Sequence, residues 1–336
     1  MNPTCLTGFV AACTLMIAVG FTVSIANETN PQQAVSNDSP TNQGNDVEVT
    51  HRFLACGKTT YIMEPNGKPS WTYPASTRDG YVMEDGQILL TLSRSKKHKG
   101  GAVVLVDPVS NEETLLWQGT QAEVNSAQPT DTGTFVLTEA GENPRLIEID
   151  GDGEVLIEFG LKCQKEKTHM QTRMTRKLAD GSYLAPHLLD FGVFQYDSEG
   201  DVISKFDTSA ENDPEHEIHN WPFTAIRHGD GNTLVCLTHG NRVVDFDSEG
   251  NIVWELSNDD LPGNWIQDAC GAQVLPNGNV VITSYAGGRV DRKAPKLIEV
   301  NREKEVVWKY ADRKKVGIHH FQILTTNGEK ITNPKK

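Results

Sequence analysis

Histidines are the side chains of this 336-residue chain best suited to chemistry, because imidazole titrates near neutral pH and can act as base, acid, nucleophile or ligand. Six of the ten recur at related places in the sequence: His169, His187, His219, His239, His319 and His320. Three arginines occur beside them, and guanidinium groups orient carboxylate, sulfate or phosphate: Arg78, Arg94 and Arg173. These side chains could serve one site only if the fold brings distant segments together.

The stretch Glu217–Leu256 shows the kind of element that could do this. Its four short runs are rich in β-branched and aromatic residues and predict strands: Phe223–Arg227, Thr233–Thr238, Arg242–Phe246 and Asn251–Leu256. Glycine and aspartate residues between the runs predict hairpin turns. Four antiparallel strands joined by tight turns are one blade of a β-propeller, and a single blade needs neighbours to bury both its faces.

The turn glycine after the first strand recurs along the whole chain. It appears at intervals of 47, 48, 50, 47 and 50 residues: Gly86, Gly133, Gly181, Gly231, Gly278 and Gly328. The repeats predict an all-β fold, a six-bladed β-propeller of four-stranded antiparallel blades. Because the repeats begin with a second half ending at Tyr73 and finish with a first half, Ile318–Ile331, N- and C-terminal strands are predicted to close the ring in one shared blade.

Four tryptophans occupy the same position of the outer strand in four repeats: Trp71, Trp117, Trp254 and Trp308. A ligand-binding aromatic residue would not be expected to recur in phase with the repeat. Their recurrence therefore predicts packing between neighbouring blades.

A propeller places the loops that enter the inner strands and the loops after the second strands on one rim of the central channel. Counting from the marker glycines, we predict three catalytic candidates on this rim, as nucleophile or base: His219, His319 and His320. The predicted ligand-binding residues are Arg78, Arg94, His169, Gln171, Arg173, His187, Trp221, His239 and Asp268. The same count places Glu123, Asn125, Glu139, Cys270 and Tyr285 on this rim.

The N-terminal residues differ in composition from the repeats. Residues 1–26 carry no charged side chain and end in Ser24-Ile25-Ala26, which predicts a signal peptide cleaved after Ala26. An uncleaved membrane anchor and a lipoprotein site at Cys13 are the alternatives. Residues 27–50 are polar and predict a disordered spacer, with the propeller in residues 51–336. We therefore expect an exported protein, periplasmic or extracellular, that does not insert in the membrane once the signal is cleaved.

Charge and cysteine content limit the partners. A formal net charge of −14 argues against nucleic acid and anionic membrane surfaces as partners. Beyond the signal, Cys56, Cys163, Cys236 and Cys270 allow two disulfides in three pairings, or buried free thiols. We expect a monomer without a cofactor or metal, and three rim histidines around one metal ion are the alternative.

Three stretches of the repeat resemble bacterial exported propellers described as PQQ-like or arylsulfotransferase-like: His228–Leu256, Leu275–Tyr285 and Leu297–Tyr310. The resemblance covers about residues 51–331 and implies six blades around a channel that holds a sulfate-accepting histidine. His219-Asn220, followed by Thr238-His239-Gly240, is similar in position to motifs of that family. The resemblance therefore implies His219 as nucleophile or base, with His319 and His320 as competitors.

Together these features predict an exported propeller that binds a small polar ligand, anionic or carbohydrate, at a channel mouth lined by histidine and arginine. Group transfer or cleavage that depends on a histidine is the chemistry open to such a site. The alternative is a non-catalytic scaffold for partners in the cell envelope.

Overall fold

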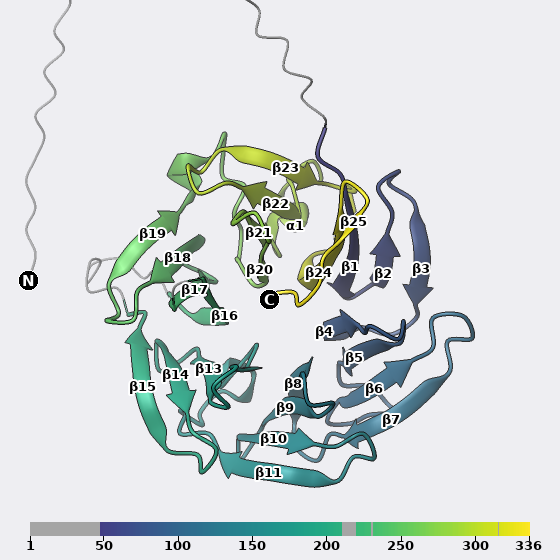
Figure 1. The fold of residues 1–336 in the computed structure, drawn as a ribbon, viewed down its shortest axis with the longest axis vertical. Helices are drawn as coiled ribbons and strands as arrows, with labels where there is room; N and C mark the ends of the chain where they lie inside the picture. The colour runs from purple at the N-terminus through teal and green to yellow at the C-terminus, as the bar shows by residue number, and fades with distance from the viewer. Residues whose placement is uncertain (1–47, 210–219, 230, 315) are drawn as a thin grey trace, which may run out of the picture. The chain divides into compact units, whose positions relative to one another are not determined.

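The structure is a computed structural model, and it describes residues 48–336 apart from 210–219, 230 and 315. In these residues six antiparallel sheets are arranged as blades around one central axis (Figure 1). Helix in the described residues is limited to α1 (Gly287–Val290) and two single turns, η1 (Thr168–Met170) and η2 (Asn258–Asp260). The predicted all-β six-bladed propeller is confirmed.

Five blades follow the chain from the inner strand to the outer one. The second blade contains β4 (Thr77–Val82), β5 (Ile88–Leu92), β6 (Ala102–Val106) and β7 (Glu113–Gln118). The third contains β8 (Glu123–Pro129), β9 (Phe135–Ala140), β10 (Arg145–Ile149) and β11 (Val155–Gly160). The fourth contains β12 (Arg176–Lys177), β13 (Tyr183–His187), β14 (Gly192–Tyr196) and β15 (Val202–Asp207). The fifth contains β16 (Pro222–His228), β17 (Asn232–Leu237), β18 (Arg242–Phe246) and β19 (Ile252–Leu256), and the sixth β20 (Ala272–Val274), β21 (Val280–Thr283), β22 (Leu297–Val300) and β23 (Val306–Tyr310).

The first blade is built from both ends of the repeat region. It contains β24 (Ile318–Thr326), β1 (His51–Gly57), β2 (Thr60–Met63) and β3 (Pro69–Tyr73), with a short β25 (Glu329–Lys330) paired to β24. Strands β24 and β1 pair antiparallel along their whole length. The predicted closure of the ring is therefore confirmed, and the yellow and purple strands lie side by side in Figure 1.

The marker glycines have the conformation that their role requires. All six have φ between 80° and 96°, a region that side chains with a Cβ rarely enter. Five of them end the tight turn between the first two strands of a blade, and Gly328 ends the turn between β24 and β25. The repeat seen in the sequence is therefore a repeat of turn geometry.

The hydrophobic core lies in six layers between neighbouring blades. The recurring tryptophans lie near the outer strands and contact the next blade. Indole nitrogens donate to the next blade in three cases: Trp71 to Asn111 Oδ1 at 2.8 Å, Trp117 to Glu139 Oε1 at 2.9 Å, and Trp254 to the main-chain oxygen of Arg302 at 2.9 Å. Trp308 packs edge-on against the His51 ring at 4.6 Å. Packing between blades is thus confirmed.

Three glutamines bind neighbouring inner strands together around the channel. Their side-chain oxygens accept hydrogen bonds of 2.7 Å from main-chain N–H groups of the next blade: Gln128 from Lys177, Gln273 from Ile323 and Gln322 from Val82. These bonds satisfy N–H groups that the short inner strands leave without a partner strand.

The predicted signal peptide lies outside the described residues, as does the spacer up to residue 47. Within residues 48–336, gaps excepted, no helix is long and apolar enough to cross a membrane. The four cysteines of the propeller are buried free thiols, which is one of the two states left open by the sequence.

Candidate functional site

A pocket of about 290 Å³ opens on one rim of the channel. Loops entering the inner strands and loops after the second strands both line it, and Leu188, Phe223 and Cys270, which pack in one apolar cluster, are part of its lining. Seven predicted site residues line the pocket: Arg78, His169, Arg173, Trp221, His239, Asp268 and His319. The propeller therefore brings together side chains from five of its blades.

A repeated β-bulge explains how several of these side chains reach the pocket. At the rim end of four inner strands the pairing register skips one residue: Arg78 in β4, Asn125 in β8, Phe223 in β16 and His319 in β24. A bulge adds a residue to one strand and redirects its side chain. Three of the four skipped residues line the pocket, and the fourth donates from its amide to the main-chain oxygen of Thr172 at 3.0 Å.

Arg173 is the most unusual residue of the pocket. Its side chain is only 1% exposed, and Nη1 donates to the main-chain oxygen of Thr172 at 2.7 Å. Within the described part of the chain no carboxylate lies within ion-pair distance of this guanidinium. Burial, with the charge of Arg78 adding to it, lowers the pKa of Arg173 to about 9.

Arg78, Glu123 and His169 form a chain along one wall of the pocket. Arg78 Nη2 lies 3.1 Å from Glu123 Oε2, and His169 Nδ1 lies 3.0 Å from the same oxygen. Burial alone would raise the pKa of Glu123, but the His169 hydrogen bond and the Arg78 charge lower it to about 2. Since one carboxylate faces two buried arginines, the wall has an excess of positive charge and is suited to an anion.

His239 and Asp268 face each other on another side of the pocket. Nδ1 lies 3.0 Å from Asp268 Oδ1, and the imidazole packs against Trp221 with ring centroids 4.7 Å apart. Asp268 has a positive φ of 57°, and its N–H donates to Asn241 Oδ1 at 2.8 Å. A carboxylate that holds Nδ1 leaves Nε2 free to take a proton, which is the arrangement of a general base and its orienting group.

His319 has a different environment. Its Nδ1 lies 2.9 Å from the main-chain oxygen of Arg78, so Nδ1 donates and Nε2 carries a lone pair. Burial lowers the pKa of His319 to about 3, and the Arg78 charge acts in the same direction. This imidazole is therefore neutral near pH 7 and is a hydrogen-bond acceptor facing the pocket.

Five predicted residues are not found in the pocket. Gln171 bonds the main chain of Gly141 at 2.8 and 2.9 Å. His187 is fully buried and stacks on Phe194 at 4.3 Å. Arg94 lies outside the pocket lining, His320 points into the channel, and His219 lies outside the described residues.

The apolar pocket residues Met170, Leu188 and Phe223 were not predicted from the sequence. Phe223 lies eight residues before its marker glycine, as Arg78 does before Gly86. This shared spacing could have placed Phe223 at the pocket. In the described residues no three His, Cys, Asp or Glu side chains are placed to hold a metal ion.

Comparison with known protein families found no match, and no curated protein matches the chain in sequence. Solved structures are similar in fold. A protein of unknown function from Bacteroides caccae is 22% identical with a TM-score of 0.67, covering 81% of this chain and 98% of that protein. A catalytically inactive histidine-to-alanine variant of virginiamycin B lyase from Staphylococcus aureus, with quinupristin, is 13% identical with a TM-score of 0.54, covering 81% and 86%.

A chain of a nidogen/laminin complex is 11% identical with a TM-score of 0.57, covering 81% and 97%. At these identities the likeness shows the β-propeller fold alone. The resemblance to PQQ-like and arylsulfotransferase-like proteins therefore stays a prediction.

Proposed function

We propose that this chain binds a small organic anion with an apolar or aromatic part in the pocket at the channel mouth. The observation that carries the proposal is Arg173, a buried guanidinium with no carboxylate at ion-pair distance in the described residues. A buried charge without a partner costs several kcal/mol, about 3–5 in measured cases. An anionic ligand would offset this cost at the moment of binding.

The walls of the pocket favour a ligand with two kinds of surface. Arg78 and Arg173 would hold a carboxylate, sulfate or phosphate group, which guanidinium groups bind with charge-assisted hydrogen bonds. Trp221, Phe223 and Leu188 would contact an apolar or aromatic part. An acidic ligand is therefore preferred over a neutral carbohydrate, and aryl sulfates stay within the proposed class.

For chemistry in this pocket, the geometry favours His239 over His319. A base with a pKa of about 3 accepts protons weakly near neutral pH, whereas His239 is oriented by the carboxylate of Asp268 at 3.0 Å. His239 would take a proton from a ligand whose anionic group is held by the arginines, in a group transfer or cleavage. On a similar fold, a histidine-to-alanine variant of virginiamycin B lyase is described as catalytically inactive.

Export to the periplasm or the extracellular space is part of the proposal. It is supported by the apolar, uncharged residues 1–26 and by the polar residues that follow them. The N-terminal residue of the protein recovered outside the cytoplasm tests it. Asn27 at the start of the chain is expected, and retention of Met1 would contradict cleavage.

The ligand proposal is tested by titration calorimetry with the purified protein and matched pairs of compounds: an aryl sulfate, an aryl carboxylate and a uronate against their neutral analogues. We expect the acidic compound of each pair to bind and its neutral analogue not to bind. Arg173→Met should weaken it at least about tenfold, because a charge-assisted hydrogen bond is lost. The matched control is Arg52→Met. Arg52 lies in β1, is partly exposed, and pairs with Glu64 at 2.8 Å outside the pocket. Equal binding of neutral analogues, or equal loss in both variants, would contradict the proposal.

One observation favours the alternative of a non-catalytic scaffold. The outer strands of four successive blades expose aliphatic side chains by more than half: Leu115, Leu156, Ile203 and Val253. A scaffold would keep its partner when His239 is replaced by alanine, whereas an enzyme should lose turnover about a hundredfold.

A further inference from the structure

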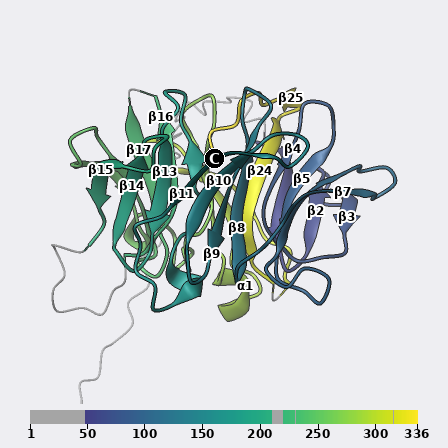
Figure 2. The same cartoon turned by 90° about the horizontal axis from the view of Figure 1, so that it is seen from below.

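Residues 331–336 enter the channel at the end of the ring that lies opposite the pocket. They follow β25, and the main-chain oxygen of Lys335 accepts from Val274 N at 2.9 Å. In Figure 1 the end of the chain lies at the centre of the ring, and in Figure 2 β25 and α1 mark opposite ends of the channel. The side chain of Lys336 is thereby placed inside the ring, where it is only 3% exposed.

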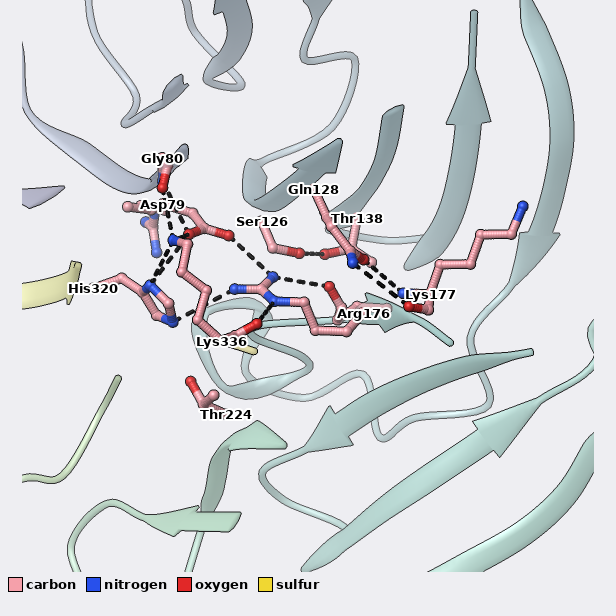
Figure 3. Close-up of polar contacts among 12 residues, drawn as sticks. Asp79, Gly80, Ser126, Gln128, Thr138, Arg176, Lys177, Thr224, His320 and Lys336 are labelled. Carbon is pink, nitrogen blue, oxygen red and sulfur yellow. Dashed lines mark hydrogen bonds and ion pairs between the residues drawn. The ribbon is translucent and has the colours of Figure 1, made fainter. Parts of the chain in front are cut away.

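The Lys336 ammonium group occupies a built site. Nζ donates to the main-chain oxygen of Gly80 at 2.7 Å, lies 3.4 Å from Asp79 Oδ1 and 3.3 Å from His320 Nδ1, and sits 3.8 Å from the centre of the Tyr81 ring. Figure 3 shows these polar groups converging on the ammonium. Two oxygen acceptors, one imidazole nitrogen and one aromatic face thus surround the three donors and the charge of a primary ammonium group.

The groups that contact the ammonium belong to the rigid inner strands and not to the tail. Asp79, Gly80 and Tyr81 lie on β4, and His320 lies on β24. Arg176 holds Asp79 from the other side, with Nη1 3.0 Å from Oδ2, and also donates from Nε to the main-chain oxygen of Lys336 at 2.7 Å. The site therefore keeps its shape and its anion when the tail is absent.

The cluster has more cations than side-chain carboxylates. Asp79 is the one side-chain carboxylate of the described residues that pairs with these cations, and it faces both Arg176 and Lys336. Burial lowers the pKa of Lys336 to about 8, although the charge of Asp79 opposes this shift. A second cation bound at one carboxylate is held less firmly than a simple ion pair.

We propose that Asp79, Gly80, Tyr81 and His320 form a binding site for a primary alkylammonium group, which Lys336 fills from within the same chain. This site would bind a cation, whereas the pocket is proposed to bind an anion. The proposal for the channel site does not depend on the function proposed for the pocket. A small primary amine is expected to take the place of the lysine side chain when that side chain is removed.

The test uses the full chain with Lys336→Ala, which keeps the tail and empties the site, and n-butylammonium as the probe. The probe should raise the melting temperature of this variant by roughly 2–4 °C, by mass action. The control is Lys335→Ala, because Lys335 is exposed and its main-chain bond to Val274 stays in place; this variant should show no rise. A rise of equal size in both variants, no rise in either, or an equal rise with neutral n-butanol would overturn the proposal.

A second measurement on the unchanged protein covers the case in which Lys336→Ala fails to fold. An amine-acylating reagent at pH 7 should modify Lys336 at least about tenfold more slowly than Lys335. An excess of n-butylammonium should raise the ratio of modification at Lys336 to that at Lys335, a ratio that does not change when the probe itself consumes reagent. Modification of both lysines at the same rate would overturn the proposal. Neither outcome bears on anion binding by Arg173, so the two proposals fail separately.

Discussion

The pocket and the channel cluster are built from neighbouring residues of the same two strands. Arg78 and Asp79 are adjacent in β4, and His319 and His320 are adjacent in β24. The bulge at the start of each strand sends the first residue of each pair to the pocket and leaves the second in the channel. Two sites of different chemistry thus arise one residue apart.

The two sites deal with buried positive charge in different ways. In the channel, Asp79 lies 3.0 Å from Arg176 and the site is filled by Lys336. In the pocket, Glu123 pairs with Arg78 at 3.1 Å, and Arg173 is left without a carboxylate at ion-pair distance in the described residues. Each site has one side-chain carboxylate for two cations, but in the channel both cations lie within 3.4 Å of that carboxylate, whereas in the pocket Arg173 is left available to a ligand.

The largest effect is expected from Asp79→Asn, which leaves Arg176 and Lys336 buried without their anion. The free energy of unfolding should fall by about 3–5 kcal/mol, measured by urea denaturation. Asp268→Asn should lower it by less than about 1 kcal/mol, because that carboxylate is partly exposed at the pocket. Similar losses in the two variants would show that the channel is not balanced by Asp79.

A smaller but more discriminating effect is expected from the two arginines. Arg176→Met should lower the free energy of unfolding by about 2–3 kcal/mol, since Asp79 loses its closest ion partner. Arg173→Met should leave the unliganded protein as stable as before or more stable by about 1 kcal/mol, because it removes a buried charge that has no ion partner. Urea denaturation without ligand checks both, and a large loss in Arg173→Met would mean that the pocket is already balanced.

The next prediction concerns the pH dependence of stability. The folded protein lowers the pKa of His319 from its ordinary value near 6.5 to about 3, so it disfavours the imidazolium form. The stability that this neutral ring contributes is complete above pH 6.5 and is lost as the pH falls from 6.5 toward 3. From pH 7 to pH 4 the wild type should lose roughly 1–2 kcal/mol more than His319→Gln, allowing for solvent screening of a half-buried ring.

Thermal or urea unfolding of both proteins at matched pH values measures this difference. Between pH 7 and pH 9 the two curves should run parallel, because His319 is neutral in both the folded and the unfolded state there. A difference that grows above pH 7 would contradict the assignment.

The fold could be predicted from the sequence because the turn glycines recur at nearly constant spacing. Each strand is short, and its residues are buried by the next blade, so the repeat of Gly86 through Gly328 fixes both blade number and ring closure. The predicted strands of the fifth blade differ from β16 to β19 by at most one residue at either end. The turn residues and the closure of the ring both indicate six blades, which is why the fold could be predicted.

The site could be predicted only in part. Counting from the glycines placed Arg78, Arg173 and Asp268 near the channel, since these positions depend on blade phase alone. Counting could not separate His319 from His320, because a bulge leaves no clear mark in the sequence. The entry of Lys336 into the channel was also not predicted, since a lysine near the end of a chain is usually solvated.

The smallest effect is expected from Arg94, which lies outside the pocket lining but whose charge helps to lower the pKa of Arg78. Its positive field should attract an anionic ligand toward the pocket without holding it. Arg94→Gln should slow association about twofold to threefold at low salt and leave dissociation unchanged, measured by stopped-flow mixing. The effect should disappear near 0.5 M salt, where the Debye length falls to about 4 Å. A faster dissociation in Arg94→Gln would instead place this side chain in contact with the ligand, and the pocket would then extend beyond the residues that now line it.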